Sequence, residues 1–425
     1  MDSTVILISV TLLVLLVLSV PIGVALGLTV VVGVFASNIP ATFLAQRLIT
    51  SLDSFPLLAV PFFIMAGEIM QKGSMAQRLL EFSRCLVGHI TGGLAQVSVL
   101  TSLFFGALSG SSPATVAAVG GVMIPTMKKE GYSSSYAAAV STSAGCLGVM
   151  IPPSIPLIIY GTTAGVSVGD LFIAGILPGI FVAVTLMLTA YMLARYQGHG
   201  VRGKRPPISE TAHALKEAFH ALMVPVIVLG GIYGGIMTPT EAGVIAVVYA
   251  LLAESIFLRS LSLDKLWQVL RGTALTTATI FLLIATASAL GQILLFNNVP
   301  SQIVELLTGI SENKYILMLV IIVMMLILGT FMDALANILI LTPLLLPVAK
   351  QAGFDPIHFG IIMIVSVAIG FLTPPVGVNL FVGCDIAKIS IERLSIAILP
   401  FLGAMILALL ILAFVPQISL LLLGR

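Results

Sequence analysis

Charged residues are scarce in this chain: Asp, Glu, Lys and Arg make up 8% of its 425 residues, whereas 59% are hydrophobic. Soluble domains carry about 25% charged residues, so the composition excludes a soluble globular protein and indicates a multi-pass membrane protein. The mean hydropathy of +1.18 agrees with this conclusion. The net charge of +2 identifies no class of partner, and we expect no nucleic acid among the partners.

Cysteine and the motifs of common enzymes are equally scarce. Cys85, Cys146 and Cys384 have no CxxC spacing, which argues against a disulfide framework and against a metal site. No HExxH and no Walker A motif occurs, so nothing indicates a zinc protease or ATP hydrolysis by the chain itself. The sequence therefore predicts a protein that is not an enzyme and that uses no cofactor.

An intramembrane enzyme is the alternative from a different class. An intramembrane serine protease needs a serine and a histidine that face each other inside the membrane. The GSSP segment at 110–113 offers serines, but all five histidines fall near loops or amphipathic segments. They are His89, His199, His213, His220 and His358.

Long apolar stretches occupy most of the chain, and several exceed the roughly 20 residues that one membrane-spanning helix needs. The N-terminus lacks a basic segment before its first apolar residues, so we expect a retained first span and no cleavable signal peptide. Stretch 5–37 is interpreted as two short spans divided at Pro21, and 221–258 as two spans divided at 238–240. We expect about ten spans. Four amphipathic segments are expected to lie along the membrane surface: 41–52, 71–90, 259–271 and 299–314.

An internal repeat with an offset of 222 residues is the most informative feature. PTMKKEG at 125–131 recurs as PVAKQAG at 347–353, and the offset holds without a gap through the following prolines and glycines. The matched positions include Lys128 with Lys350, Gly131 with Gly353, Gly148 with Gly370, Pro152–Pro153 with Pro374–Pro375, and Gly161 with Gly383. This pattern indicates a duplicated membrane domain, with its first repeat at 1–220 and its second at 221–425.

Lysine and arginine counts orient the two repeats. Basic residues flank segment 93–127 on both sides, which predicts a re-entrant hairpin with both ends in the cytoplasm and its tip at SGSSPAT, 109–115. The equivalent hairpin, 315–349, comes out on the opposite face, so the repeats are inverted, as in secondary transporters with sites at interrupted helices. A broken helix follows each hairpin, at 133–166 and at 356–387.

The first hairpin tip is polar, and such a break at membrane depth is tolerated only where it is buried in protein or lines a cavity. Proline cannot donate a hydrogen bond to the carbonyl four residues earlier, so Pro113 is expected to free the Ser109 carbonyl. Ser112 is predicted as an N-cap and Pro113 as the first residue of a half-helix. The positive end of that half-helix would face an anionic substrate.

The two double-proline breaks are expected to free four more carbonyls, those of Gly148, Val149, Gly370 and Phe371. Together with the Thr373 hydroxyl, they form an oxygen-only site that suits a hard cation such as sodium. The alternative is that these prolines are kinks of the kind that is common in membrane helices. Two symmetric double-proline breaks, each with its own hairpin, favour a site.

The second hairpin tip contains Asp333, an acidic residue at membrane depth and therefore a candidate functional residue. The alternative is that Asp333 caps the following half-helix. Asn337 lies one turn away, and Asn379 in the second break is a candidate substrate contact. For Asn379, a helix–helix hydrogen bond is an equally good interpretation.

Three other charged residues are interpreted as structural. Thr238, Pro239 and Glu241 have the spacing of a capping box, so we expect Glu241 to stabilise a helix start. Arg47 and Asp53 bracket an amphipathic segment, where an ordinary solvated charge is the expected role.

Four segments carry a resemblance to a known family: FFGALSGSSPATVAAVG (104–120), GVMIPPSIPLIIYG (148–161), GGIYGGIMTPTEAG (230–243) and HFGIIMIVSVAIGFLTPPVGVNLFV (358–382). Through these segments the chain resembles the large membrane subunit of TRAP transporters, the DctM-like family. The resemblance extends from about Pro21 to Pro416. The resemblance implies sodium-coupled, binding-protein-dependent uptake of an organic acid across the bacterial inner membrane, by an elevator-type mechanism. It also implies a periplasmic substrate-binding protein and a small membrane subunit, which we expect to be a separate chain.

We therefore expect an all-α polytopic membrane protein, an inverted-repeat elevator-type transporter with two re-entrant hairpins and interrupted helices. Sodium, the coupling ion, is expected at the tips and breaks: Ser109, Gly148, Ile151, Pro153, Gly329, Asp333, Gly370 and Thr373. The substrate is expected between them, at Ser112, Thr115, Ser154, Asn337 and Asn379. C4-dicarboxylates and sugar acids such as sialic acid are both open as substrates, and a stand-alone sodium–carboxylate symporter is the nearest alternative.

Overall fold

The fold is a set of helices, and no strand occurs among the described residues, which are all except 1–2, 19, 38, 201–202, 312 and 375 of a computed structural model. The helices of the first half are α1 (Ser3–Val17), α2 (Ile22–Ala36), α3 (Ala41–Thr50), η1 (Phe55–Leu58), α4 (Ala59–Lys72), α5 (Met75–Val87), α6 (Gly93–Ser109), α7 (Ser112–Thr115), η2 (Val116–Gly120), α8 (Gly121–Lys129), α9 (Ser134–Gly145), α10 (Leu147–Met150), α11 (Ile155–Ala164), α12 (Val168–Gln197) and α13 (Ile208–Tyr233). Those of the second half are α14 (Pro239–Leu252), η3 (Ala253–Phe257), α15 (Leu263–Phe296), α16 (Val299–Ile310), α17 (Lys314–Gly329), α18 (Ala334–Gln351), α19 (Pro356–Gly370), α20 (Val378–Ala387), α21 (Ile391–Phe414), α22 (Gln417–Leu420) and η4 (Leu421–Leu423).

Short polar side chains start many of these helices by accepting a hydrogen bond from the first-turn backbone N–H groups. The capping residues are Ser133, Ser167, Thr238, Ser262, Asn313, Asp333, Asp355 and Ser390. At α14 the Thr238 hydroxyl accepts from the Glu241 N–H while the Glu241 carboxylate accepts from the Thr238 N–H. The predicted capping box is therefore confirmed.

Seven of the described helices are long and apolar enough to cross a membrane, and the bent pair α9–α10 with α11 forms one further candidate. This is fewer than the expected ten, because α1 and α2 have 15 residues each. The predicted divisions near Pro21 and at 238–240 are confirmed by the starts of α2 and α14. The predicted surface helix at 259–271 is wrong, because α15 continues from Leu263 to Phe296.

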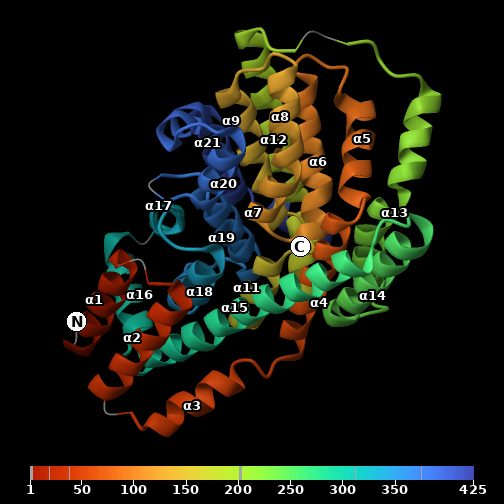
Figure 1. The fold of residues 1–425 in the computed structure, drawn as a ribbon. Helices are drawn as coiled ribbons and strands as arrows, with labels where there is room; N and C mark the ends of the chain where they lie inside the picture. The colour runs from red at the N-terminus through yellow and green to blue at the C-terminus, as the bar shows by residue number, and fades with distance from the viewer. Residues whose placement is uncertain (1–2, 19, 38, 201–202, 312, 375) are drawn as a thin grey trace.

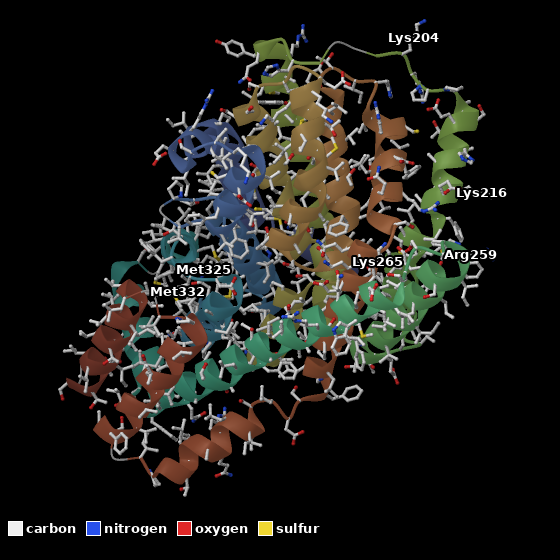
Figure 2. All side chains as sticks on the ribbon, viewed as in Figure 1. Lys204, Lys216, Arg259, Lys265, Met325 and Met332 are labelled. Carbon is white, nitrogen blue, oxygen red and sulfur yellow. The ribbon has the colours of Figure 1, made fainter. Side chains whose placement is uncertain are left out.

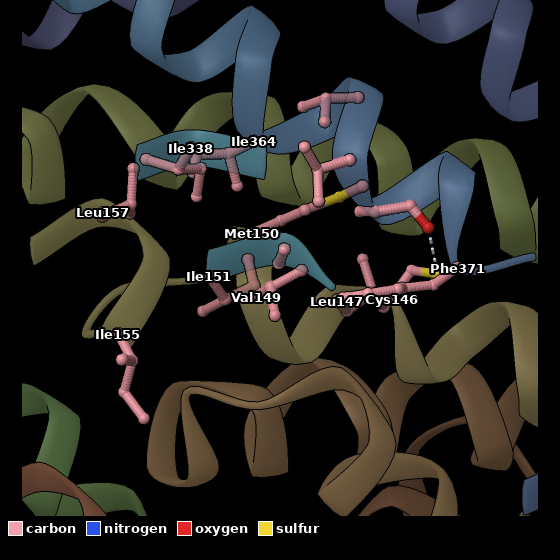
Figure 3. Close-up of a cluster of buried hydrophobic side chains, with 14 of the residues drawn as sticks. Cys146, Leu147, Val149, Met150, Ile151, Ile155, Leu157, Ile338, Ile364 and Phe371 are labelled. Atoms are coloured by element: carbon pink, nitrogen blue, oxygen red, sulfur yellow. Dashed lines mark hydrogen bonds between the residues drawn. The ribbon is translucent and has the colours of Figure 1, made fainter. Parts of the chain in front are cut away.

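The helices of the two halves correspond at the same offset that relates their sequences. A shift of 222 residues, the separation of Cys146 and Ala368, takes α6 onto α17, α9 onto α19 and α12 onto α21. The Cys146 thiol donates to the Ala368 carbonyl at 3.0 Å, so the two broken helices meet at equivalent residues. Figure 3 shows this contact within the apolar cluster around Met150 and Phe371. The predicted boundary at residue 220 lies inside α13.

The helices separate into an upright bundle and a set that crosses it. In Figure 1, α6, α8, α9 and α12 stand side by side, and α15 runs obliquely across the front. Helix α15 packs against α2 and α4 and also against α18 of the second hairpin. Helix α15 therefore connects the N-terminal helices α2 and α4 to the second hairpin.

Helix α5 is fixed at its start by a residue far along the chain. The fully buried Glu254 carboxylate accepts hydrogen bonds from the Ser74 and Met75 N–H groups, both at 2.9 Å, and from the Ser260 hydroxyl. Lys265 Nζ in turn donates to the Ser260 carbonyl at 2.8 Å. Figure 2 labels Lys265, in the first turn of α15, and Arg259, just before that helix. Helix α5 was expected to lie along the membrane surface, but it packs along α6 and α13.

Candidate functional site

The tip of the first hairpin is a compact group of oxygen atoms. Helix α6 ends at Ser109, and Gly110 turns the chain with φ +58°, a left-handed conformation that glycine adopts without strain. The Ser109 and Thr115 hydroxyls lie 2.8 Å apart, and Thr115 Oγ1 also donates to the Ser111 carbonyl at 2.8 Å. These three oxygens are all hard ligands of the kind that sodium takes.

The first tip sits directly on the first break. A Cβ added at Gly148 would overlap the Thr115 hydroxyl and lie 2.5 Å from the Ser111 carbonyl oxygen. The Pro153 carbonyl lies on the other side, close to Gly110. The structure therefore brings the predicted sodium residues Ser109, Gly148 and Pro153 together around the tip oxygens.

The start of the half-helix in this tip differs by one residue from the prediction. Ser111 is the N-cap of α7, with an extended backbone and no side-chain cap bond, and Ser112 and Pro113 are its first two residues. The fully buried Ser112 hydroxyl accepts a hydrogen bond from Asn379 Nδ2 at 2.7 Å. Ser112 therefore connects the first tip to α20 of the second repeat.

The other residues predicted at the first break point away from the tip. Ser154 Oγ donates to the Val149 carbonyl at 2.7 Å, so this carbonyl, which was predicted to be free, has a partner. The Ile151 side chain packs on Gly179 of α12. Ser154 and Ile151 thus shape the break itself and face neither the tip oxygens nor the cavity described below.

The second tip meets the second break through glycine. A Cβ at Gly370 would lie 2.6–2.7 Å from the backbone of Gly329. The backbone of the tip therefore touches the backbone of the break, with no side chain between them. The prediction of free carbonyls here is wrong for both positions. The Gly370 carbonyl accepts from Thr373 N at 3.0 Å, and the Phe371 carbonyl accepts from Asn379 N at 3.2 Å.

The Thr373 hydroxyl is also engaged, because it donates to the Ile369 carbonyl at 2.9 Å. Pro375, the second proline of this break, lies outside the described residues.

Asp333 is the helix cap that was the alternative to a functional role. Its Oδ2 accepts from Leu335 N at 3.2 Å, which caps α18, and the residue also lines the cavity between the tips. Asn337 is fully buried, and its Nδ2 donates to the Met332 carbonyl at 3.1 Å. Its Oδ1 has no hydrogen-bond partner among the described residues.

Asn379 makes the inter-helix hydrogen bond that was the alternative to substrate contact. It is fully buried, donates to Ser112, and lies 3.5 Å from the Cys146 sulfur. Its Oδ1 has no partner within the described part of the chain. A buried amide with one unused acceptor retains the capacity to bind a further donor.

A cavity of about 370 Å³ lies between the two tips and the helices α4 and α15. From the predicted site it includes Ser109, Ser112 and Asp333, but not Thr115, Ser154, Asn337 or Asn379. Five polar lining residues were missed by the sequence analysis: Glu68, Gln71, Ser111, Thr276 and Thr279. Glu68 was detectable, since it is an acidic residue within an apolar helix.

The chain matches the family described as "Tripartite ATP-independent periplasmic transporter, DctM component" over residues 9–418. It is 45% identical, over 95% of its length, to an isethionate TRAP transporter permease protein, DctMQ, of Oleidesulfovibrio alaskensis, and it spans 64% of that relative. It is 37% identical to the sialic acid TRAP transporter large permease protein SiaM of Vibrio cholerae, with 89% of each chain covered. A C4-dicarboxylate large permease protein, DctM, of Pseudomonas aeruginosa is 39% identical, with 89% of this chain and 88% of the relative covered.

Two solved structures share the fold. The YdaH transporter of Alcanivorax borkumensis aligns with a TM-score of 0.64 at 15% identity, over 88% of each chain. MtrF of Neisseria gonorrhoeae aligns with a TM-score of 0.55 at 12% identity, over 88% of this chain and 83% of MtrF. This likeness supports the all-helical membrane fold with hairpins and interrupted helices.

Proposed function

The chain belongs to the DctM component family of TRAP transporters, multi-pass proteins of the bacterial inner membrane, and from this premise we propose that it takes up an organic acid anion together with sodium. The anion is a carboxylate or a sulfonate, since the named relatives are described for sialic acid, C4-dicarboxylates and isethionate. No enzymatic step is part of the proposal.

The charge of the cavity between the tips carries this proposal. Asp333 and Glu68 line it, and no Lys, Arg or His occurs among its described lining residues. An anion that enters a cavity with two carboxyl groups meets repulsion unless a cation is bound with it. Sodium at the tips would supply that cation, and the anion would then bind only with the ion, which is the basis of coupled transport.

The oxygen atoms of the two tips are the proposed sodium ligands. At the first tip they are Ser109 Oγ, Thr115 Oγ1 and the Ser111 carbonyl, which already lie within hydrogen-bond distance of one another. At the second tip the Asp333 carboxylate and the backbone carbonyl of Gly329 would hold the ion. Bound sodium would draw each tip onto its break and complete the walls of the substrate cavity.

We further propose that the tips and breaks move together against α4 and α15. These two helices form the opposite wall of the cavity, while the tip residues belong to the hairpins. A displacement along that wall would carry the cavity from one membrane face to the other, as in an elevator. A periplasmic binding protein would deliver the anion, and a small membrane subunit would complete the complex.

Uptake into proteoliposomes tests this proposal. The chain is reconstituted with its small subunit, and labelled isethionate, succinate and sialic acid are each offered with and without the matching binding protein, under an inward sodium gradient. A potassium gradient is the control. We expect uptake of one acid that needs both sodium and the binding protein.

Each other outcome contradicts a defined part of the proposal. Uptake without the binding protein would make the chain a stand-alone symporter. Equal uptake in sodium and potassium would remove the coupling ion, and no uptake of any of the three acids would reject this substrate class.

A further inference from the structure

A second polar cavity, of about 340 Å³, lies along the same wall as the first. Helix α15 lines the first cavity with residues from Thr276 to Leu283 and the second with residues from Ile284 to Leu295. Helix α18 likewise lines the first cavity near Asp333 and the second at Leu339 and Pro343. The two cavities therefore occupy successive positions along one contact between α15 and α18.

The two cavities face opposite sides of the membrane. The start of α15 is its basic end, with Arg259, Lys265 and Arg271, and such residues favour the cytoplasm. The later half of α15 then points to the periplasm, together with α3, which lies at the far end of the molecule from the 203–207 loop in Figure 1. The first cavity is thus nearer the cytoplasm and the second nearer the periplasm.

Arg47 distinguishes the second cavity. It comes from the last turn of α3, its Nε is buried, and no hydrogen bond or ion pair to its side chain occurs among the described residues. No Asp or Glu is present among the described residues that line this cavity. Hydroxyl and amide side chains do line it, including Ser51, Ser54, Ser288 and Gln292.

The Arg47 side chain is partly exposed, but its buried Nε–H has no partner among the described residues, and an unsatisfied buried donor is costly. The planar set of N–H groups on a guanidinium matches the oxygens of a carboxylate or sulfonate. Arg47 was expected to be an ordinary solvated charge; the residue is partly exposed, and its Nε is buried against the cavity. The charge of this cavity is also opposite to that of the first cavity, which has two carboxyl groups and no cationic residue among its described lining.

We propose that the Arg47 cavity is a periplasmic receiving site for the organic oxyanion, which binds there before it reaches the tips. The proposal rests on the proposed function for the identity of the anion. Arg47 attracts and orients the anionic group, and Ser54 and Gln292 satisfy its remaining oxygens. Because the first cavity repels a bare anion, the receiving site holds the anion until sodium has bound at the tips.

Uptake kinetics in the reconstituted complex give the first test. Arg47→Gln is expected to raise KM for the acid–binding-protein complex about tenfold, the effect of losing one charge-assisted hydrogen bond, with a smaller change in the maximal rate. Arg47→Lys, which keeps the charge, is expected to restore most of the affinity. Asp53→Asn is the matched control, because Asp53 is a nearby charge that does not line the cavity. An unchanged KM in Arg47→Gln overturns the proposal.

Thiol labelling gives a second test that needs no transport. Ser288→Cys places a thiol in the wall of the cavity and leaves Arg47 in place; it is made with Cys85→Ser and Cys384→Ser, while the buried Cys146 is retained. A membrane-impermeant methanethiosulfonate reagent is added from the periplasmic side, with and without millimolar isethionate or succinate. The acid is expected to slow labelling of position 288 several-fold, and Arg47→Gln in the same background is expected to abolish this protection.

The two tests separate this proposal from the proposed function. Protection of the introduced thiol without any uptake would support the receiving site while contradicting transport of the acids tested. Uptake by the wild type with no protection of the thiol in Ser288→Cys would overturn the receiving site alone. Labelling is also compared in vesicles of phosphatidylcholine with and without phosphatidylglycerol, to distinguish the acid from an anionic lipid headgroup. Protection that depends on the anionic lipid and not on the acid would also overturn the receiving site.

Discussion

The two hairpin tips occupy equivalent positions in the repeats but are held in different ways. The first tip is bound by side chains, through the Ser109–Thr115 contact and the hydrogen bond from Asn379 to Ser112. The second tip touches its break through the backbones of Gly329 and Gly370, and its polar groups bond within their own helix start. The duplication therefore kept the close approach of tip and break and changed the polar chemistry.

The difference in charge follows from single positions. The repeat offset takes Ser111 to Asp333 and Thr115 to Asn337, so a neutral hydroxyl in the first tip corresponds to a carboxylate in the second. A carboxylate binds a cation more strongly than neutral oxygens do. We therefore expect two sodium sites of unequal affinity, with the stronger one at Asp333.

Replacement of the contact glycines has the largest expected effect on this comparison. In Gly370→Ala the new Cβ would lie 2.6–2.7 Å from the Gly329 backbone, so the second tip must separate from its break. We expect loss of uptake and a destabilisation of about 1–3 kcal/mol, as for other overpacked sites. Thermal unfolding in detergent and proteoliposome uptake measure the two effects.

Two alanine variants control this experiment. Gly121→Ala has no atom within 4 Å of the added Cβ, so it is expected to leave uptake unchanged. Gly329→Ala places its Cβ 3.3 Å from Gly370 Cα and needs only a small shift, so its effect is expected to be intermediate. Normal uptake in Gly370→Ala would show that transport does not need the close contact between the second tip and its break.

Asp333 gives the next largest effect, because it combines a helix cap with the proposed cation ligand. Asp333→Asn retains a capping side chain, so we expect stability close to that of the wild type but a rise of at least about tenfold in the sodium concentration for half-maximal uptake. Asp333→Ala is expected to lose about 1 kcal/mol of stability as well. Sodium titration of uptake and thermal unfolding separate the two roles.

The equivalent change in the first tip, Ser111→Ala, serves as the comparison. Ser111 makes no side-chain cap bond, so little change in stability is expected. If Asp333→Asn and Ser111→Ala shifted the sodium titration equally, the proposed charge difference between the tips would be wrong.

The two buried asparagines have the smallest expected effect on uptake, although not on stability. Asn379→Ala removes the donor to Ser112 and leaves a buried hydroxyl without this partner, at a cost of about 1–3 kcal/mol. Asn337→Ala removes one hydrogen bond within a single helix start, at about 1 kcal/mol. We expect Asn379→Ala to reduce the maximal uptake rate several-fold and Asn337→Ala to change it less. If Asn337→Ala reduced the rate more than Asn379→Ala, the side-chain contacts of the second tip would matter more for uptake than those of the first tip.

The sequence predicted the tips and breaks well because proline and glycine act locally. Pro113, Pro152 and Gly148 restrict the backbone whatever surrounds them, and the repeat marks the same positions twice. The carbonyls of Gly370 and Phe371 were harder to predict. Proline identifies which N–H is missing, but not which other N–H, here those of Thr373 and Asn379, takes its place.

Apart from Glu68, the polar residues that α4 and α15 contribute to the first cavity were not predictable from local pattern. Glu68, Gln71, Thr276 and Thr279 come from two helices about 200 residues apart, and only tertiary packing brings them to the tips. The continuous α15 was missed for a different reason. In the first repeat, residues 51–54 separate α3 from η1, and Pro56 lies in the first turn of η1. The equivalent position in the second repeat is Ala278, which continues the helix.

The bond between Glu254 and the start of α5 also has a consequence for biosynthesis. The residues it joins, Ser74 and Glu254, are 180 positions apart, so at 5–20 residues per second the ribosome needs roughly 9–36 s to supply the cap. Until then α5 begins with unsatisfied N–H groups. The start of α5 therefore reaches its final hydrogen bonding only after Glu254 has been made. This helix start matures only after the second half has begun to emerge, which joins the assembly of the two halves at this contact.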